Sequence, residues 1–246
     1  LYMKNRIFII DGSSYLYRAY HAMPPLTTSS GKPTGAVKGV TNMLMNLKKE
    51  SEGSPIVVVF DAKGKNFRHD IFEEYKSNRP PMPDDLREQL KPVNDICKGI
   101  GFPLLDVEGV EADDVIASAV KQIKLNNTQI IISSGDKDLA QLVDDNTVLI
   151  NNFDSKVLDV EGVKDKFGVK PSQIFDYLCL VGDTSDNIPG VPKVGPKTAV
   201  TLLEQYNDLD NIIENSSQLK GKLKENIESS IAVSYTHLTL PTNREV

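Results

Sequence analysis

Seven carboxylates crowd into three short stretches of this sequence. The stretches are GVEADD, SGDKD and GDTSDN, and their acids are Glu111, Asp113, Asp114, Asp136, Asp138, Asp183 and Asp186. Like charges so close together raise one another's pKa values and destabilise a fold unless something compensates them. Divalent cations do so, and oxygen ligands without His or Cys select hard ions such as Mg²⁺ or Mn²⁺. The pattern therefore favours a metal site.

Two further aspartates follow apolar stretches that are typical of strands. RIFIID ends at Asp11, and SPIVVVFDAKG places Asp61 just after its valines; QIIISSGDKD gives Asp136 the same position after a third such run. Strands alternate with helical patterns, for example at 35–50 and 83–101. This alternation predicts an α/β fold with a mostly parallel central sheet flanked by helices. In such sheets sites form beyond the carboxyl ends of the strands, so the acids should converge there.

Nine carboxylates thus form one candidate metal site. They are Asp11, Asp61, Glu111, Asp113, Asp114, Asp136, Asp138, Asp183 and Asp186. Each stretch alone could instead be a helix cap or a polar turn. On a helix, Glu111 and Asp114 would share a face and Asp113 would serve a neighbouring position. A single Mg²⁺ keeps several waters and needs few carboxylates, so this many acids imply two or more ions, an arrangement suited to in-line displacement at phosphorus.

Charge and composition narrow the function classes. The net charge of −6 argues mildly against a nucleic-acid partner. Setting the nine acids aside leaves 25 acids against 28 lysines and arginines, so the remainder is slightly basic. Cys97 and Cys179 are far apart and are typical of buried reduced thiols, which fits a cytoplasmic protein, and three scattered histidines do not indicate zinc. We expect no membrane span and no secretory signal.

From about residue 160 onward the pattern predicts helices only. GVPKVGPKTA (190–199) is typical of a helix-hairpin-helix connection, in which Gly190 and Gly195 let the backbone approach a phosphate. Pro196 suits the first position of the following helix. With Lys193, Lys197 and Thr198, this element is a candidate contact to the DNA backbone. An ordinary glycine-containing helix connection is the alternative.

The stretch 64–83 is polar, partly basic and then rich in proline, which predicts a mobile loop or an exposed helical excursion. Here Tyr75 could stack on a base, and Lys76 and Arg79 could bind the reacting phosphate. Arg18 and Lys63, near the first two acids, are further phosphate candidates. The alternative for each cation is a solvated surface charge.

Five long stretches resemble the 5′-nuclease domain of bacterial DNA polymerase I, within the flap endonuclease family. They are DGSSYLYRAYHAMPPL, VVFDAKGKNFRHDIFEEYKSNRPPMPDDLR, GVEADDVIA, SSGDKDLAQLV and GDTSDNIPGVPKVGPKTA, and the resemblance runs from about residue 6 to about residue 232. It implies a helical arch near 64–83 and a helix-hairpin-helix that holds duplex DNA. All nine acidic positions of the family's metal site match this sequence. We expect Lys76 and Arg79 to act electrostatically on the scissile phosphate, with Tyr75 orienting the end nucleotide.

The same resemblance implies an activity. The family cleaves 5′ flaps and removes 5′ nucleotides from duplex DNA at nicks and 5′ ends, including RNA primers, with metal-activated water. The expected cofactors are two or more Mg²⁺ or Mn²⁺ ions, and K⁺ could bind at the helix-hairpin-helix. The protein would act as a monomer, without membrane contact.

The resemblance also suggests a domain division. We expect an α/β nuclease core over 1–160, a helical DNA-binding region over 161–232, and a non-native or out-of-frame tail over 233–246, with the polymerase domains absent from this chain. Three rival functions stay open: a module that binds DNA junctions without cutting, a phosphatase or phosphotransferase with Asp11 as nucleophile, and a ribonuclease. Ser13, where the phosphatase chemistry usually needs a second acid, counts against that rival.

Overall fold

A mostly parallel sheet organises the chain. The computed structural model describes residues 5–124, 128–219 and 221–227. Its main sheet has the order β3-β2-β1-β4-β5-β6. The strands are β1 (Arg6–Asp11), β2 (Ile56–Val59), β3 (Leu104–Leu105), β4 (Gln129–Ser134), β5 (Thr147–Asn151) and β6 (Val157–Leu158). All neighbours pair in parallel except β6, which runs antiparallel to β5. The predicted α/β fold is confirmed.

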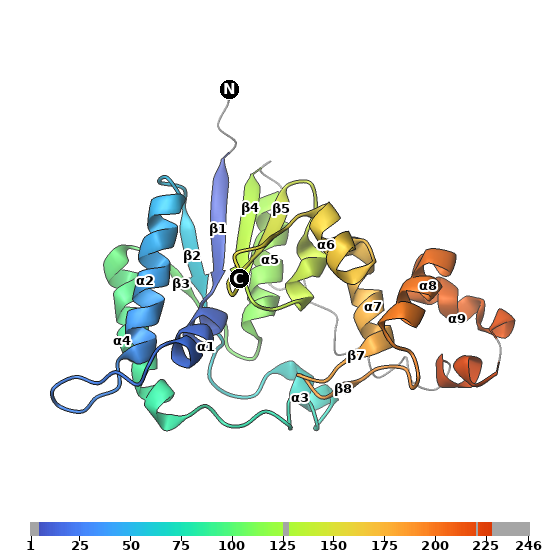
Figure 1. Cartoon of the computed structure of the whole chain (residues 1–246), viewed down its shortest axis with the longest axis horizontal. Helices are drawn as coiled ribbons and strands as arrows, with labels where there is room; N and C mark the ends of the chain where they lie inside the picture. The colour runs from blue at the N-terminus through green and yellow to red at the C-terminus, as the bar shows by residue number, and fades with distance from the viewer. Residues whose placement is uncertain (1–4, 125–127, 220, 228–246) are drawn as a thin grey trace.

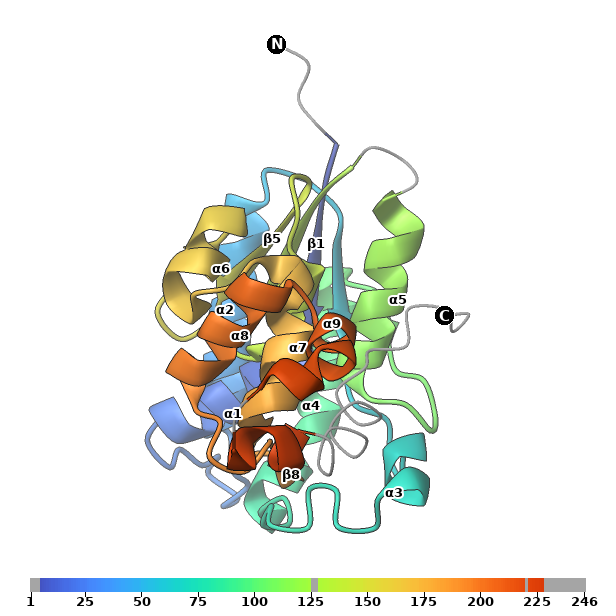
Figure 2. The ribbon, with the colours of Figure 1, turned by 90° about the vertical axis from the view of Figure 1, so that its right-hand side faces the viewer.

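Helices cover both faces of this sheet, because a parallel sheet must bury both of its faces. Along β1, Phe8 and Ile10 belong to the core formed with α1 (Gly12–Ala22), α2 (Gly35–Glu50) and α4 (Asp84–Ile100). Ile9, between them, belongs to the other core, which includes α5 (Ala112–Lys124). Figures 1 and 2 show α2 and α5 on opposite sides of β1. The helices predicted at 35–50 and 83–101 are confirmed.

The strand order creates a switch point at the end of β1. From β1 the chain continues to β2 and β3 on one side, then crosses to β4 and β5 on the other. The loops that leave β1 and β4 therefore diverge, and crevices at such points bind ligands in open α/β sheets. Asp11 ends β1, and Asp136 follows β4, so both acids flank this crevice.

The segment 64–83 contains one short helix, α3 (Phe67–Ile71), followed by turns. Most of the expected helical arch is therefore not helical. Hydrogen bonds also join this segment to the turn between β7 and β8. The backbone N–H of Lys76 donates to the carbonyl of Asp186 at 3.0 Å, and the Asn187 side chain donates to the carbonyl of Glu74 at 2.8 Å.

The rest of the described chain is mainly helical. It contains the 3₁₀ turn η1 (Asp138–Leu142), α6 (Val160–Phe167), η2 (Pro171–Gln173), α7 (Ile174–Val181), α8 (Pro196–Tyr206), α9 (Leu209–Glu214) and η3 (Ser216–Gln218). Within the described residues, no helix has the length and apolar character needed to cross a bilayer. The tail predicted over 233–246 lies outside the described residues.

A small hairpin departs from the prediction of helices only. The strands β7 (Gly182–Asp183) and β8 (Ile188–Pro189) pair antiparallel between α7 and α8. Gly182 has φ of 81°, and a Cβ there would lie 2.3 Å from the backbone nitrogen of Gly190. Only glycine permits this conformation and this close approach. The hairpin matters because it carries two of the predicted acids, Asp183 at the end of β7 and Asp186 in the turn.

Candidate metal and phosphate site

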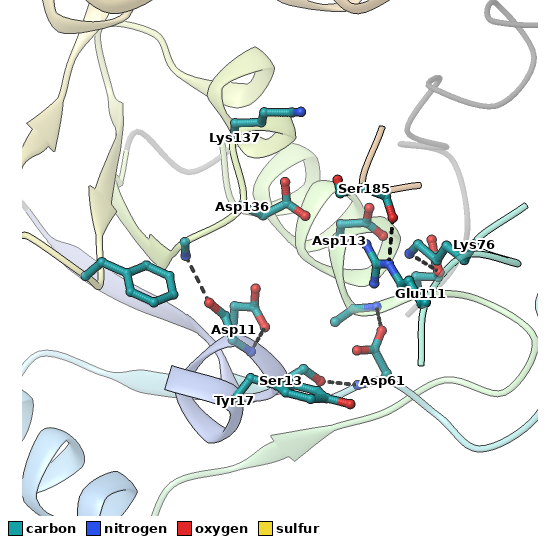
Figure 3. Close-up of a pocket in the computed structure, with 15 residues that line it drawn as sticks. Asp11, Ser13, Tyr17, Asp61, Lys76, Glu111, Asp113, Asp136, Lys137 and Ser185 are labelled. Atoms are coloured by element: carbon teal, nitrogen blue, oxygen red, sulfur yellow. Dashed lines mark hydrogen bonds and ion pairs between the residues drawn. The ribbon is translucent and has the colours of Figure 1, made fainter. Parts of the chain in front are cut away.

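Five predicted acids line one cavity of about 370 Å³ at the carboxyl edge of the sheet. They are Asp11, Asp61, Glu111, Asp113 and Asp136. They come from the end of β1, the loop after β2, the start of α5 and the loop after β4. Figure 3 shows them around the pocket, with the cations Lys76 and Lys137 at its sides. The parallel strands bring these acids to the same edge of the sheet, as predicted.

Asp11 and Asp61 also fix helix starts. Asp11 caps α1 by accepting a hydrogen bond from the Ser14 backbone at 2.8 Å, and its other oxygen accepts one from the Ser134 hydroxyl at 2.6 Å. Asp61 accepts a hydrogen bond from the backbone N–H of Ala112, the first residue of α5, at 2.9 Å. Burial raises the pKa of Asp11 to about 7, although both hydrogen bonds lower it. Both acids are therefore held in place by the elements that they cap.

The start of α5 separates three neighbouring acids. Asp113 faces the pocket together with Glu111, whereas Asp114 is 1% exposed. Glu111 and Asp114 both contact Arg68, as their predicted shared face requires, but only Glu111 also lines the cavity. One oxygen of each carboxylate nevertheless lies within 4.8 Å of the others. Burial and then the charges of Asp114 and Glu111 raise the pKa of Asp113 well above its usual value.

A buried arginine compensates Asp114. The two terminal guanidinium nitrogens of Arg68 donate to the two carboxylate oxygens of Asp114 at 2.6 and 2.7 Å, and Nη1 also donates to Glu111 at 3.3 Å. Arg68 is 2% exposed. Asp114 in turn accepts a hydrogen bond from the Glu111 backbone at 3.1 Å. The pair therefore anchors Glu111 by both its main chain and its side chain.

The SGDKD stretch forms a tight turn after β4. Asp136 accepts a hydrogen bond from the Asp138 backbone at 2.9 Å, and burial raises its pKa. Asp138 is 9% exposed and lies outside the cavity lining. Burial, followed by the charges of Asp136 and Asp183, raises its pKa well above normal. Its Oδ1 is buried without a hydrogen-bond partner in the described part of the chain.

The β7–β8 turn brings Asp183 and Asp186 to the back of the same cluster. Asp183 receives the Lys137 ammonium at 3.1 Å and the Ser185 hydroxyl at 2.6 Å. Burial would raise the pKa of Asp183, but these contacts hold it below the usual value. Asp186 is 8% exposed and pairs with Arg79 and, at 3.5 Å, with Lys76. Neither acid lines the cavity, although Ser185 between them does.

The predicted phosphate-binding residues of 75–79 reach this cluster. The Lys76 ammonium contacts Glu111 at 2.5 Å, and both Lys76 and Arg79 line the cavity. Tyr75 is 3% exposed, and its hydroxyl donates to Glu111 at 2.7 Å and to Asp186 at 3.0 Å. Its ring is therefore inside the protein here, not presented to a base. Burial and the two acids raise its pKa, so the hydroxyl stays a donor.

The other predicted DNA contacts occupy separate places. The Arg18 guanidinium lies 5.8 Å from the centre of the Phe153 ring, beside the cavity, and Lys63 is exposed next to Asp61. In the helix-hairpin-helix, Lys193 and Lys197 are exposed, and Lys193 has φ of 67°. Gly190 follows β8, Gly195 caps α8 and Thr198 lies in its first turn.

Several residues of the site escaped the sequence reasoning. Lys137 lines the cavity between two predicted acids of SGDKD, where its position could have drawn attention. Arg68 carried no signal, because nothing in FRHDI distinguishes a buried guanidinium from a surface one. Tyr17 and Phe153 also line the cavity. Phe153 follows a strand in an ordinary polar turn, so only its place in the fold reveals it.

The donor set fits hard divalent cations. The cavity offers carboxylate oxygens and no His or Cys ligand among its lining residues. Burial and mutual repulsion raise the pKa values of Asp11, Asp113, Asp136 and Asp138, so their charged forms need a compensating cation. The unpartnered Oδ1 of Asp138 is a further acceptor beneath the cavity.

Comparisons with known proteins agree with this picture. Residues 6–168 match the family model of the N-terminal resolvase-like domain of 5′-3′ exonucleases, and residues 169–243 match that of their C-terminal SAM fold. The chain is 52% identical to DNA polymerase I of Pseudomonas aeruginosa over 98% of its own length but spans only 28% of that protein. It is 42% identical to a 5′-3′ exonuclease of Aquifex aeolicus, over 98% of this chain and 83% of that protein.

A solved structure has the same fold. The bacteriophage T5 flap endonuclease, in a complex with DNA and metal ions, superposes with a TM-score of 0.80 at 24% sequence identity, over 96% of this chain and 89% of that one. At this identity the likeness concerns the fold alone. The two family models and the Aquifex relative carry the assignment: this chain belongs to the 5′-3′ exonuclease family.

Proposed function

We propose that the protein is a divalent-metal-dependent 5′ nuclease that hydrolyses phosphodiesters in DNA, both from 5′ ends and at 5′ flaps. The observation that carries this proposal is the cavity itself. Carboxylates from four separate elements meet there with the cations Lys76, Arg79 and Lys137. Metal-binding acids beside cations that can neutralise a phosphate are the parts that phosphodiester hydrolysis needs. The T5 flap endonuclease complex with DNA and the 5′-3′ exonuclease of Aquifex support the substrate class and the direction of cleavage.

The acids have two roles in this proposal. Asp11, Asp61, Glu111, Asp113 and Asp136 would hold the ions directly, and Asp138, Asp183 and Asp186 would complete the cluster through water. Two or more Mg²⁺ or Mn²⁺ ions would be bound, and they would supply a hydroxide nucleophile at neutral pH and offset charge on the phosphate. Asp114 was predicted as a metal ligand. Because it forms a bidentate pair with Arg68, we propose instead that Asp114 positions Glu111.

The chain's own residues position the substrate. Lys76 and Arg79 now contact Glu111 and Asp186, and they would turn toward the scissile phosphate when it enters. Tyr75 would anchor the base of this segment through Glu111 and Asp186 rather than stack on DNA. Asp11 is a poor nucleophile, because both of its oxygens already accept hydrogen bonds. A nuclease therefore fits better than a phosphatase that forms an aspartyl-phosphate.

The duplex behind the cleavage point would bind at the helix-hairpin-helix. Lys193 and Lys197 are exposed there, and the first turn of α8, after Pro196, carries the backbone N–H groups of Lys197 and Thr198. We propose that K⁺ could bind between this hairpin and a phosphate. We keep the division into a core over 1–160 and a DNA-binding region over 161–232. The substrates would include nicks and RNA–DNA primers, and the protein would act as a monomer in the bacterial cytoplasm.

The decisive experiment is cleavage of a 5′-labelled flap duplex in Mg²⁺ and in EDTA. We expect cuts near the junction in Mg²⁺ and none in EDTA. Asp113→Asn, purified in parallel, should lose cleavage by a factor of about 10³ or more yet still bind the flap. Asp95→Asn is the matched control, because Asp95 is an exposed acid of α4 that pairs with Lys91 on the surface. Binding by the native protein without cutting in either Mg²⁺ or Mn²⁺ would favour a junction-binding module.

A further inference from the structure

Phe153 is an exposed aromatic ring on the rim of the acid cavity. It is 61% exposed, more than any other large apolar side chain in the described part of the chain. It lines the same cavity as Asp11 and Asp136. A lone exposed apolar side chain is ordinary on a protein surface. Phe153 differs from such a side chain in how its ring is held and in what surrounds it.

The turn that carries Phe153 is fixed on the site. The Phe153 backbone donates to the Asn151 side chain at 2.8 Å, and the Asn152 amide donates to the Ser14 hydroxyl at 2.9 Å. The ring lies so close to Gly135 that a Cβ there would be 2.3 Å from its Cε2. Gly135 directly precedes Asp136. The ring therefore packs against the loop after β4, which carries Asp136, and its turn is hydrogen-bonded to α1.

The ring also has a cation beside it. Arg18 donates to the Phe153 carbonyl at 3.4 Å, and its guanidinium is 5.8 Å from the ring centre. An exposed aromatic with an adjacent arginine is the combination that binds nucleotides in single strands, because the ring stacks on a base while the cation meets the phosphate. Tyr75, the residue predicted to stack, is buried and cannot fill this role in the described conformation.

We infer that Phe153 stacks on the nucleobase next to the scissile phosphate, with Arg18 at the neighbouring phosphate. The inference rests on the proposed nuclease function, because a phosphodiester bound by the ions that Asp11 and Asp136 would hold has its flanking bases at this rim. The stack makes Phe153 a binding residue that orients the nucleotide. It selects an unpaired or partly unstacked nucleotide, whose face is open, over one inside a duplex.

The first test measures steady-state cleavage of a flap duplex by Phe153→Ala and Phe153→Tyr. Phe153→Ala should raise KM about tenfold, within the range for loss of one base–aromatic stack, and change kcat less than threefold. Phe153→Tyr should stay close to the native protein. Val157→Ala is the control, because Val157 is 55% exposed in the same β5–β6 hairpin but does not line the cavity. Unchanged KM in Phe153→Ala would overturn the inference.

A second test separates stacking from support of Arg18. Each nucleotide flanking the cleaved bond is replaced in turn by an abasic tetrahydrofuran residue. At one position the abasic substrate should raise KM for the native protein and remove the difference from Phe153→Ala. A defect of Phe153→Ala that persists at every abasic position would show that the ring only holds Arg18, and would refute stacking. Failure of the native protein to cut the intact flap in Mg²⁺ would overturn the proposed function, and the stack with it.

Discussion

Replacement of Arg68 by methionine should destabilise the protein far more than replacement of any nearby surface cation. Arg68 is 2% exposed, and its partner Asp114 is 1% exposed. Arg68→Met keeps similar bulk but leaves a buried carboxylate that has lost a bidentate partner. Breaking a buried pair in this way costs about 3–5 kcal/mol of unfolding free energy. For a chain of this size that corresponds to a fall in Tm of roughly 6–20 °C.

Two further variants sharpen this prediction. Arg68→Met combined with Asp114→Leu removes both charges, so most of the lost stability should return. In EDTA, Asp114→Asn and Asp113→Asn should act in opposite directions. Asp114→Asn leaves a buried guanidinium short of its anion and should destabilise the fold. Asp113→Asn should stabilise it, because burial and like charges already raise the pKa of Asp113.

The assay is urea unfolding followed by far-UV circular dichroism, in EDTA so that bound ions do not contribute. The sequence contains no Trp, so intrinsic tryptophan fluorescence offers no signal. Arg87→Met, at an exposed position of α4, is the matched control. A loss below about 1 kcal/mol for Arg68→Met would refute the reasoning. So would a gain of stability in Asp114→Asn, since it would show that Asp114 is repelled by the other acids more than it is held by Arg68.

Three other predictions follow from the site. Burial raises the pKa of Asp11 to about 7, above its ordinary range, so between about pH 4 and 7 the native state binds more protons than the unfolded state. In EDTA this group should therefore lower the free energy of unfolding as pH rises through that range. Asp11→Asn should remove that loss, as measured by urea midpoints across the range. The double variant Lys193→Ala and Lys197→Ala should weaken flap binding and make the plot of log affinity against log salt concentration less steep, by the equivalent of about two phosphate contacts. If fluorescence anisotropy gives an unchanged slope, these lysines do not contact the DNA. Gly182→Ala should lower cleavage at least tenfold, because its Cβ would meet the Gly190 backbone and displace the hairpin; native kcat/KM would contradict this.

The sequence predicted the fold class and the meeting of several acids at the carboxyl edge of the sheet. Apolar runs that end at Asp11 and before Asp136 specify parallel strands whose carboxyl ends must meet, so the meeting of the acids follows from local pattern and topology alone. The helix at 35–50 was also predictable from local pattern, because its apolar residues recur at helical spacing. The comparisons confirmed the resemblance that these motifs carried.

Only the tertiary structure decided which groups face which. Glu111, Asp113 and Asp114 are adjacent in sequence, yet the start of α5 after Glu111 turns Asp114 away from the cavity and into the protein. Whether such an acid becomes a ligand candidate or half of a buried ion pair depends on Arg68, which is far away in the chain. Aromatic rings behave in the same way, because packing buries Tyr75 and leaves Phe153 exposed. Sequence spacing sets which residues share an element, whereas burial and partner charge are set by the packing of elements that are distant in sequence.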